Sequence, residues 1–150
     1  SVDRAVLGNL EYAVPSGCSI ADRSTHQRAM VEWTPPDDNE RKESISIVRV
    51  ERAALATKGN RQIERLLRDA QSTLPGGKFT TPVRFSTKHG LAAVRIEGEL
   101  VPPGQRHAYR RIHAVVAIGR SLVHVIYTAR ELDREAFETV VESLHAGGEG

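Results

Sequence analysis

The sequence is poor in cysteine and in aromatic residues, and it contains no long apolar run. Its single cysteine, Cys18, excludes an internal disulfide framework. No stretch approaches the roughly 20 apolar residues that a membrane-spanning helix needs, so no membrane span is expected. One Trp, three Tyr and three Phe are scattered along the chain, whereas proteins that bind single-stranded nucleic acid interleave such rings with basic residues.

A large charge of either sign is also missing. The chain carries 21 Lys and Arg against 19 Asp and Glu, with both signs interspersed and a formal net charge of +2. This balance is typical of an ordinary soluble surface, and no nucleic-acid partner is expected. The basic stripe Arg61, Arg65 and Arg68 is interpreted as a solvated helix face, with phosphate binding as the minor alternative.

The length of 150 residues predicts one domain with a core of its own. We expect this domain to span residues 1–150, with an N-terminal lead at 1–9 and a loose tail at 146–150. The chain starts at Ser1 without a methionine, so a removed leader and a processed Met-Ser start both stay open. A cytoplasmic location is the expectation, and a periplasmic or exported one is the alternative. No cofactor is expected.

What the chain does contain is a run of three alternating segments between Thr80 and Ala129, joined by tight turns at 89–90 and 119–120. Treated as two-residue hairpin loops, these turns place Phe85 opposite Val94, and the apolar residues then share one face. The predicted core face consists of Val83, Phe85, Val94, Ile96, Leu100, Ile112, Val116, Val123, Val125 and Tyr127.

The middle pair of these segments is joined by the loop PPGQ at 102–105. If the register across this loop is even, the apolar residues of the two strands that it joins lie on the same face of the sheet. This register would bring Arg95 near His113 and Glu97 near Arg111 on the outer face.

The rest of the chain predicts further strands and two amphipathic helices. Strands are expected at Leu10–Val14, Cys18–Asp22, Arg28–Trp33 and Ser44–Arg52. A polar loop with two prolines separates the last two strands at 34–43. The helices are marked by two apolar stripes: Ile63, Leu66, Leu67 and Ala70, and, after an N-cap at Asp133, Phe137, Val140, Val141 and Leu144. This order predicts an α+β fold, with an antiparallel sheet of six or seven strands flanked by helices.

None of the possible enzymatic motifs is complete. Cys18 lies in a β-type stretch and is interpreted as a structural thiol, with a nucleophile as the minor alternative. The segment at 119–121 lacks the second glycine and the strand-to-helix context of a nucleophile elbow. The stretch PGGKFTT at 75–81 lacks the spacing of a phosphate-binding loop. We therefore expect a protein that is not an enzyme.

His113 and His124 are the most suggestive pair of titratable residues. The turn at 119–120 makes them diagonal neighbours, with their Cβ atoms roughly 7 to 8 Å apart. Zinc needs three or four ligands, and Glu97 or His107 would have to supply another. No metal is expected, because two surface histidines on paired strands are usually just polar residues of that face.

The outer face of the sheet is the candidate binding surface, because it mixes charge, rings and aliphatic patches where a solvated face is usually polar. The candidate protein-binding residues are Arg95, Glu97, Tyr109, Arg111, His113, Val115, His124 and Ile126. No catalytic or metal-binding residue is assigned. The apolar corner of this face needs a cover, and the helix at 60–73, a second subunit and a client segment all stay open.

Several stretches resemble a known fold family. PSGCSIADRS, SISIVRVER, GLAAVRIEGEL, and SLVHVIYTA followed by FETVVESL are similar to the PsbP-like (Mog/PsbP) fold over about Leu10 to Leu144. That resemblance implies a PsbP-like α/β/α sandwich. VPSGCSIADRS and SISIVRV resemble most the small bacterial Eag chaperones that are associated with type VI secretion effectors. Those proteins are non-enzymatic and cradle hydrophobic segments of a client effector, often as dimers.

Two function hypotheses from different classes follow. The first is a non-enzymatic protein-binding adaptor or chaperone, with a protein client or self-association as a possible homodimer. The second is an exported accessory or lipoprotein-type ligand-binding protein of the same fold, which predicts a closed pocket between helix and sheet. A hydrolytic or metal-dependent enzyme ranks last.

Overall fold

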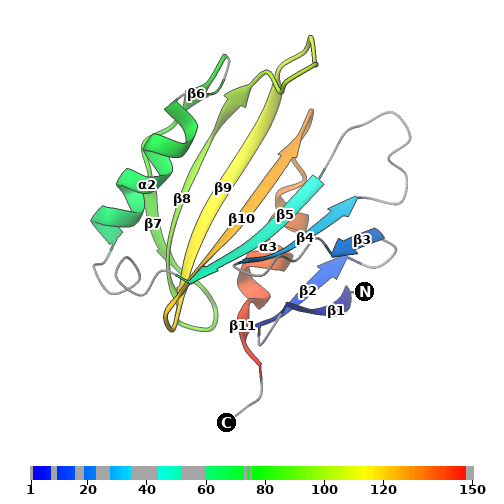
Figure 1. The fold of residues 1–150 in the computed structure, drawn as a ribbon, viewed down its shortest axis with the longest axis vertical. Coiled ribbons are helices and arrows are strands. Elements are labelled where there is room, and N and C mark those ends of the chain that lie inside the picture. The colour runs from blue at the N-terminus through cyan, green and yellow to red at the C-terminus, as the bar shows by residue number, and fades with distance from the viewer. Residues whose placement is uncertain are drawn as a thin grey trace.

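The computed structural model describes residues 2–7, 10–15, 19–22, 28–34, 44–51, 60–72, 74 and 76–147. Its centre is a large antiparallel sheet with helices on both faces (Figure 1). The strands of this sheet are β3 (Ser19–Asp22), β4 (Arg28–Thr34), β5 (Ser44–Glu51), β6 (Lys78–Phe79), β7 (Val83–Ser86), β8 (Ala92–Leu100), β9 (Tyr109–Ile118) and β10 (Ser121–Ala129).

The strand order in this sheet is β3-β4-β5-β10-β9-β8-β6, with β7 also paired to β8. The short strands β6 and β7 pair with successive parts of β8, so the eight strands fill seven positions across the sheet. The helices are α2 (Asn60–Ser72) and α3 (Arg134–Ser143). The expected α+β class, with an antiparallel sheet flanked by helices, is confirmed.

A second, smaller sheet contains β1 (Val2–Leu7), β2 (Leu10–Pro15) and β11 (His145–Ala146). The predicted lead at 1–9 was wrong, because β1 pairs with β2 along its whole length. The predicted tail at 146–150 was wrong at Ala146, which pairs with Leu10. The predictions for Cys18, for most of the 34–43 loop and for the last three residues concern positions outside the described residues.

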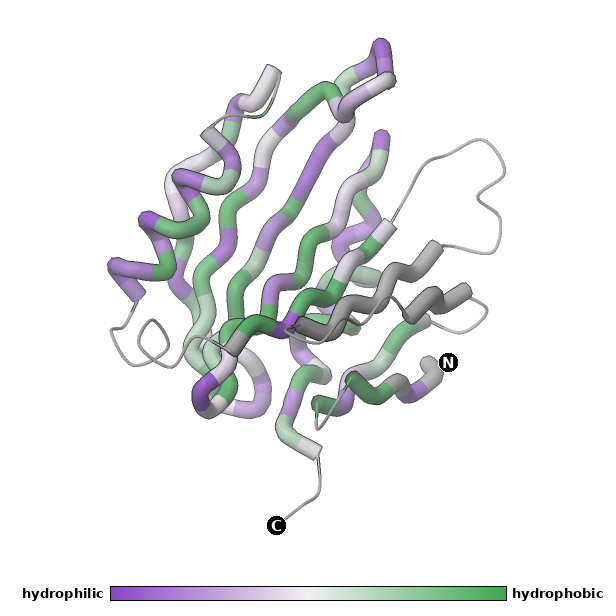
Figure 2. Tube along the Cα trace, in the orientation of Figure 1, coloured by the Kyte–Doolittle hydropathy of each residue, from purple (hydrophilic) through white to green (hydrophobic). Residues whose placement is uncertain are grey.

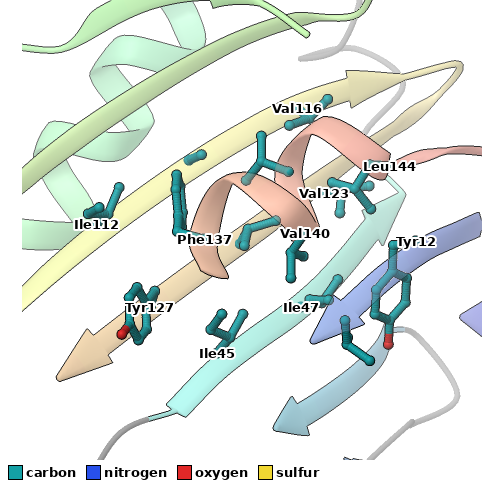
Figure 3. Close-up of a cluster of buried hydrophobic side chains, with 14 of the residues drawn as sticks. Tyr12, Ile45, Ile47, Ile112, Val116, Val123, Tyr127, Phe137, Val140 and Leu144 are labelled. Carbon is teal, nitrogen blue, oxygen red and sulfur yellow. The ribbon is translucent and has the colours of Figure 1, made fainter. Parts of the chain in front are cut away.

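The larger core lies between one face of the large sheet and a layer formed by α3 and the small sheet. Figure 3 shows Phe137 and Val140 of α3 pointing onto the strands that carry Ile45 and Val123. Each fully buried side chain of this size contributes about 1.5–3 kcal/mol to the free energy of folding. The predicted N-cap is confirmed, because Asp133 Oδ1 accepts a hydrogen bond from the Ala136 N–H at 3.1 Å.

A second, smaller core lies on the opposite face, under α2. Ile63 and Leu67 of the helix are fully buried against the sheet. Figure 2 shows hydrophobic and hydrophilic residues alternating along α2, as expected for a helix with one buried stripe. Their partners on the sheet are Val94, Ile96, Val115 and Leu122. Helix α2 therefore covers part of the outer face, which the sequence had left open.

The turn between β9 and β10 has the predicted register, with Ala114 opposite Val125 and Ile112 opposite Tyr127. Gly119 has a φ of +58°, the left-handed conformation that a tight hairpin turn requires. Within the described residues, no helix is both long enough and apolar enough to cross a membrane.

The turn between β7 and β8 was predicted wrongly by one residue. Phe85 lies opposite Ala93, and not opposite Val94. Thr87 is buried, its N–H donates to the Leu91 carbonyl at 3.0 Å, and its Oγ1 accepts from the Leu91 N–H at 3.2 Å. These bonds close a loop of three residues, which reverses the parity of β8.

The register of β8 against β9 was also wrong by one residue. Arg95 lies opposite Ala114 and Ile96 opposite His113. Val94 and Ile96 therefore face α2 and do not belong to the larger core, and Val83 is 48% exposed. Alternation alone did not reveal this, because both faces of β8 are covered and both carry apolar residues.

Candidate functional site

The α2-side face of the sheet has a covered part and an open part. Beneath α2, Val115 and Leu122 are fully buried. Beyond the helix, the residues of β5 and β10 on the same face are only half-buried, whereas the apolar residues of these strands on the α3 side are buried. We call this half-buried part the open strip; it consists of Ser46, Val48, Val50, His124 and Ile126.

A chain of hydrogen-bonded polar side chains, buried at its centre and half-buried at its ends, runs along the border between α2 and the open strip. Arg111 Nε donates to Thr128 Oγ1 at 3.0 Å, and its Nη1 lies 3.5 Å from Gln71 Oε1. Gln71 Nε2 lies 2.8 Å from His113 Nδ1, and His113 Nε2 lies 2.9 Å from His124 Nδ1. We call these five residues the buried polar chain. It connects α2 with β9 and β10.

The direction of the hydrogen bonds in this chain follows from Arg111, which can only donate. Its bond to Gln71 Oε1 leaves the Gln71 amide nitrogen as the donor to His113 Nδ1. His113 therefore carries its proton on Nε2 and donates it to His124 Nδ1. The tautomers of both histidines are thus set by the Arg111 guanidinium at the other end of the chain of hydrogen bonds.

Burial makes the charged form of His113 unfavourable. The side chain is only 3% exposed, and burial first, then electrostatic interaction with His124 and Arg111, lower its pKa from 6.5 to about 3. Burial likewise lowers the pKa of Arg111 from its usual value. His113 is therefore neutral in the folded protein at physiological pH.

The outer edge of α2 is held to the sheet by an exposed ion pair. Glu64 accepts a hydrogen bond from Arg84 Nε, and this bond lowers the pKa of the Glu64 carboxyl. Arg61, Arg65 and Arg68 are exposed, as predicted for a solvated face. An exposed pair of this kind contributes little to stability. The attachment of α2 to the sheet therefore depends on the buried side chains of Ile63 and Leu67 and on the buried polar chain.

The structure places Arg95 and Glu97 on the wrong face for the predicted site. The Arg95 guanidinium lies over the Phe85 ring, 5.5 Å from its centre, on the α3 side. Glu97 binds Arg134 at the start of α3 and lies 3.5 Å from Arg110. Partial burial would raise the pKa of Glu97, but these two arginines outweigh it and lower that pKa. The expected pairs Arg95–His113 and Glu97–Arg111 do not form.

The other six predicted residues share the α2-side face but differ in exposure. Tyr109 is buried opposite Leu100, and Val115 is buried under α2. Arg111 and His113 belong to the buried polar chain. Only His124 and Ile126 lie in the open strip, where a partner can reach them.

Gln71 was missed by the sequence analysis, although it joins the helix to the histidines. Its side chain is 4% exposed and follows Ile63 and Leu67 at four-residue spacing. A glutamine on the buried stripe of an amphipathic helix signals a polar partner below it. Val48 and Val50 were missed because they were assigned only to a strand, although β5 carries β-branched residues on both faces.

The pair His113 and His124 does not extend to a metal site within the described residues. No group of three or more His, Cys, Asp or Glu side chains in this part of the chain converges on one point. Glu97, proposed as a third ligand, lies on the opposite face. His107 is exposed in the loop before β9.

An open pocket of about 320 Å³ lies at the C-terminal end of α2. Its lining residues include Arg68, Gln71, Phe79 and Ile96. Ser72, Thr80 and Thr81 also line it. The pocket lies beside the helix, while Ile63 and Leu67 pack directly on the sheet.

Comparison with known proteins supports the fold and nothing finer. No family model matches the sequence, and no curated protein does so either. A solved structure from Pseudomonas aeruginosa, PA94, described as a protein of unknown function and a candidate regulator, has a similar fold. Its TM-score is 0.55 at 16% sequence identity, over 93% of this chain and 95% of that one.

Proposed function

We propose that this protein is a non-enzymatic adaptor or chaperone that binds a hydrophobic segment of a client protein on the open strip. The observation that carries the proposal is the half-burial of Val48, Val50 and Ile126 next to the buried cluster beneath α2. A client segment that covers these side chains gains about 25 cal/mol for each Å² of apolar surface removed from water.

The chemistry of the open strip suits an apolar segment with a few polar groups. Ser46 and His124 lie among the aliphatic side chains, so a client's polar groups have hydrogen-bonding partners within the strip. The strip is continuous with the apolar cluster beneath α2, because His124 pairs with Val115 across β9 and β10. The proposed client surface therefore adjoins the apolar cluster beneath α2.

The resemblance to Eag chaperones supplies the class of client. It implies a type VI secretion effector whose hydrophobic segment the protein cradles, and it implies dimerisation, which is frequent among those chaperones. It also implies that the protein lacks catalytic activity. We place the protein in the cytoplasm as part of the same proposal. One observation on the described residues supports the absence of catalysis. His113, the histidine with the strongly lowered pKa, is buried and uses both ring nitrogens in hydrogen bonds within the protein, as a structural histidine does and a catalytic acid or base does not.

Binding of a defined peptide tests the proposal. We would measure by fluorescence anisotropy the affinity for a labelled peptide with a Leu- and Ala-rich centre and lysines at both ends. Ile126→Lys and Val48→Lys should weaken binding at least about 10-fold, since a buried charge costs more than the ~1.4 kcal/mol of one decade. Val83→Lys changes an exposed valine on the other face and should leave the affinity within about twofold.

The pocket at the end of α2 favours the second candidate, an exported or lipoprotein-type ligand-binding protein. A small carboxylate with an apolar body would match the charge of Arg68 and the apolar side chains of Phe79 and Ile96. Thermal-shift measurements with such carboxylates test this candidate. A stabilisation that disappears in Arg68→Ala would support it, and the absence of any stabilisation at millimolar ligand would reject it.

A further inference from the structure

The contacts that hold α2 on the sheet differ in kind from those that hold α3. Counted over the described residues, the cluster beneath α2 contains six buried residues, whereas the cluster on the α3 side contains twenty. Only the α2 side includes a buried chain of polar side chains between helix and sheet, among the residues described. Loss of that chain would therefore weaken α2 while leaving the larger core intact.

The buried polar chain accepts only the neutral form of His113. A proton added at Nδ1 would point a donor at the Gln71 amide nitrogen, which also donates. Gln71 would have to turn its oxygen toward His113, and its nitrogen would then face the Arg111 guanidinium. Protonation of His113 thus breaks the Arg111–Gln71 hydrogen bond, which sets the order of donors and acceptors in the buried polar chain.

Among the residues that the structure describes, no neighbouring group compensates a charge on His113. His124 from β10 and Arg111 from β9 are the titratable or charged groups that face it, and both are basic. Helix α2 offers the neutral Gln71, and its charged residues next to it, Arg68 and Asp69, are exposed. Strand β8 offers Ile96. Solvent, in contrast to these described neighbours, would stabilise the charged ring.

We propose that the buried polar chain is a proton-sensitive contact, and that protonation of His113 releases α2 from the sheet. In the released state, water reaches His113 and its pKa returns to about 6.5. In the closed state the pKa of His113 is about 3. Between about pH 3 and about pH 6.5, opening therefore leads to uptake of one proton by His113. The equilibrium constant for opening should then rise about 30-fold when the pH falls from about 7.5 to about 5.

Release of α2 would enlarge the client surface. Val94, Ile96, Val115 and Leu122 would become accessible beside the open strip. This part of the inference rests on the proposed function, because it assigns the enlarged surface to the same hydrophobic client. Client affinity should therefore be higher at about pH 5 than at about pH 7.5.

Hydrogen exchange on the free, full-length chain tests the release directly. Protection factors, corrected for intrinsic exchange rates, would be measured at both pH values for the amides of α2 and of α3. We expect α2 to be less protected than α3 at both pH values and to lose about 30-fold in protection at the lower one. Equal protection in both helices would show that α2 opens only with the whole fold, and unchanged protection in α2 would show no release. Either result would overturn the proposal.

Two variants separate the histidine from other titrating groups. His113→Gln keeps an acceptor toward Gln71 and a donor toward His124, so protection of α2 should no longer depend on pH. Gln71→Glu places a carboxylate between Arg111 and His113, which favours the charged ring, so α2 should stay protected at about pH 5. A pH-dependent loss that persists in both variants would contradict the proposal.

Peptide binding at the two pH values distinguishes this proposal from the proposed function. If α2 opens with acid but the Leu- and Ala-rich peptide binds at neither pH, the proton-sensitive contact stands and the client function fails. If the peptide binds at about pH 7.5 and α2 stays closed at about pH 5, the client function stands and the proton-sensitive contact fails.

Discussion

His113 and His124 share a hydrogen bond of 2.9 Å across paired strands, with ring centres 5.1 Å apart and planes tilted by 47°. One ring is buried beneath α2, and the other is half-buried in the open strip. The pair thus connects the inside of a helix–sheet contact with the surface that we assign to the client. Its partner on the helix is Gln71.

Removal of the Gln71 amide should destabilise the fold. Gln71→Leu fills the same space but leaves His113 Nδ1 without its buried donor, which costs about 1–3 kcal/mol in the free energy of unfolding. Urea denaturation measures this loss. The control is Gln62→Leu, at a half-buried position of the same helix, which should change stability by less than about 0.5 kcal/mol. Equal effects at both positions would contradict the role of the buried polar chain.

Stability should depend on pH through His113. Because its pKa falls from 6.5 to about 3 on folding, the unfolded chain binds more protons between these values. The contribution of neutral His113 is fully present above about pH 6.5 and is lost as the pH falls toward about 3, up to about 4–5 kcal/mol. Denaturant titrations across this range should show the slope in the wild type and its loss in His113→Gln. A slope of the same size in the variant would assign it to other groups.

Gly98 should not tolerate a methyl group. A Cβ at this position would lie 2.2 Å from the Lys78 carbonyl oxygen and 2.7 Å from Phe79 Cα, so β6 would have to move away from β8. Gly98→Ala should cost about 1–3 kcal/mol in thermal or urea unfolding. Glu99→Ala, one residue further along the strand, removes only an exposed ion pair and should cost less than about 1 kcal/mol.

The cap of α3 can be tested with a pair of substitutions. Asp133→Ala removes the acceptor for the Ala136 N–H and should destabilise the protein by about 1 kcal/mol. Asp133→Asn keeps an acceptor at the same place and should lose at most a few tenths of a kcal/mol. If both variants lose the same amount, the negative charge matters and the hydrogen bond does not.

The parts of the fold that followed from the sequence are those where one face is polar or where a local signal is unambiguous. The N-cap at Asp133 and the turn at 119–120 are local, and both were predicted correctly. The register of β8 was not, because Val94 and Ala93 are apolar on opposite faces and Thr87 closes a three-residue loop that the sequence does not mark. That single shift moved Arg95 and Glu97 out of the predicted site.

The candidate site was predictable only in part, for a related reason. His113, His124 and Ile126 share a face because the β9–β10 turn fixes their parity. Gln71 contacts His113 from 42 residues away in sequence, through a helix position that only tertiary packing defines. The burial of His113, and with it the low pKa, depends on that helix.

The measurement that tests the central claim most directly is methyl NMR of the protein titrated with the Leu- and Ala-rich peptide. We predict that the largest shift changes occur at Val48, Val50 and Ile126 in the open strip, with Val140 and Val141 of α3 unchanged. Changes centred on α3 or on the small sheet would contradict the account, and so would a titration that leaves every methyl signal in place.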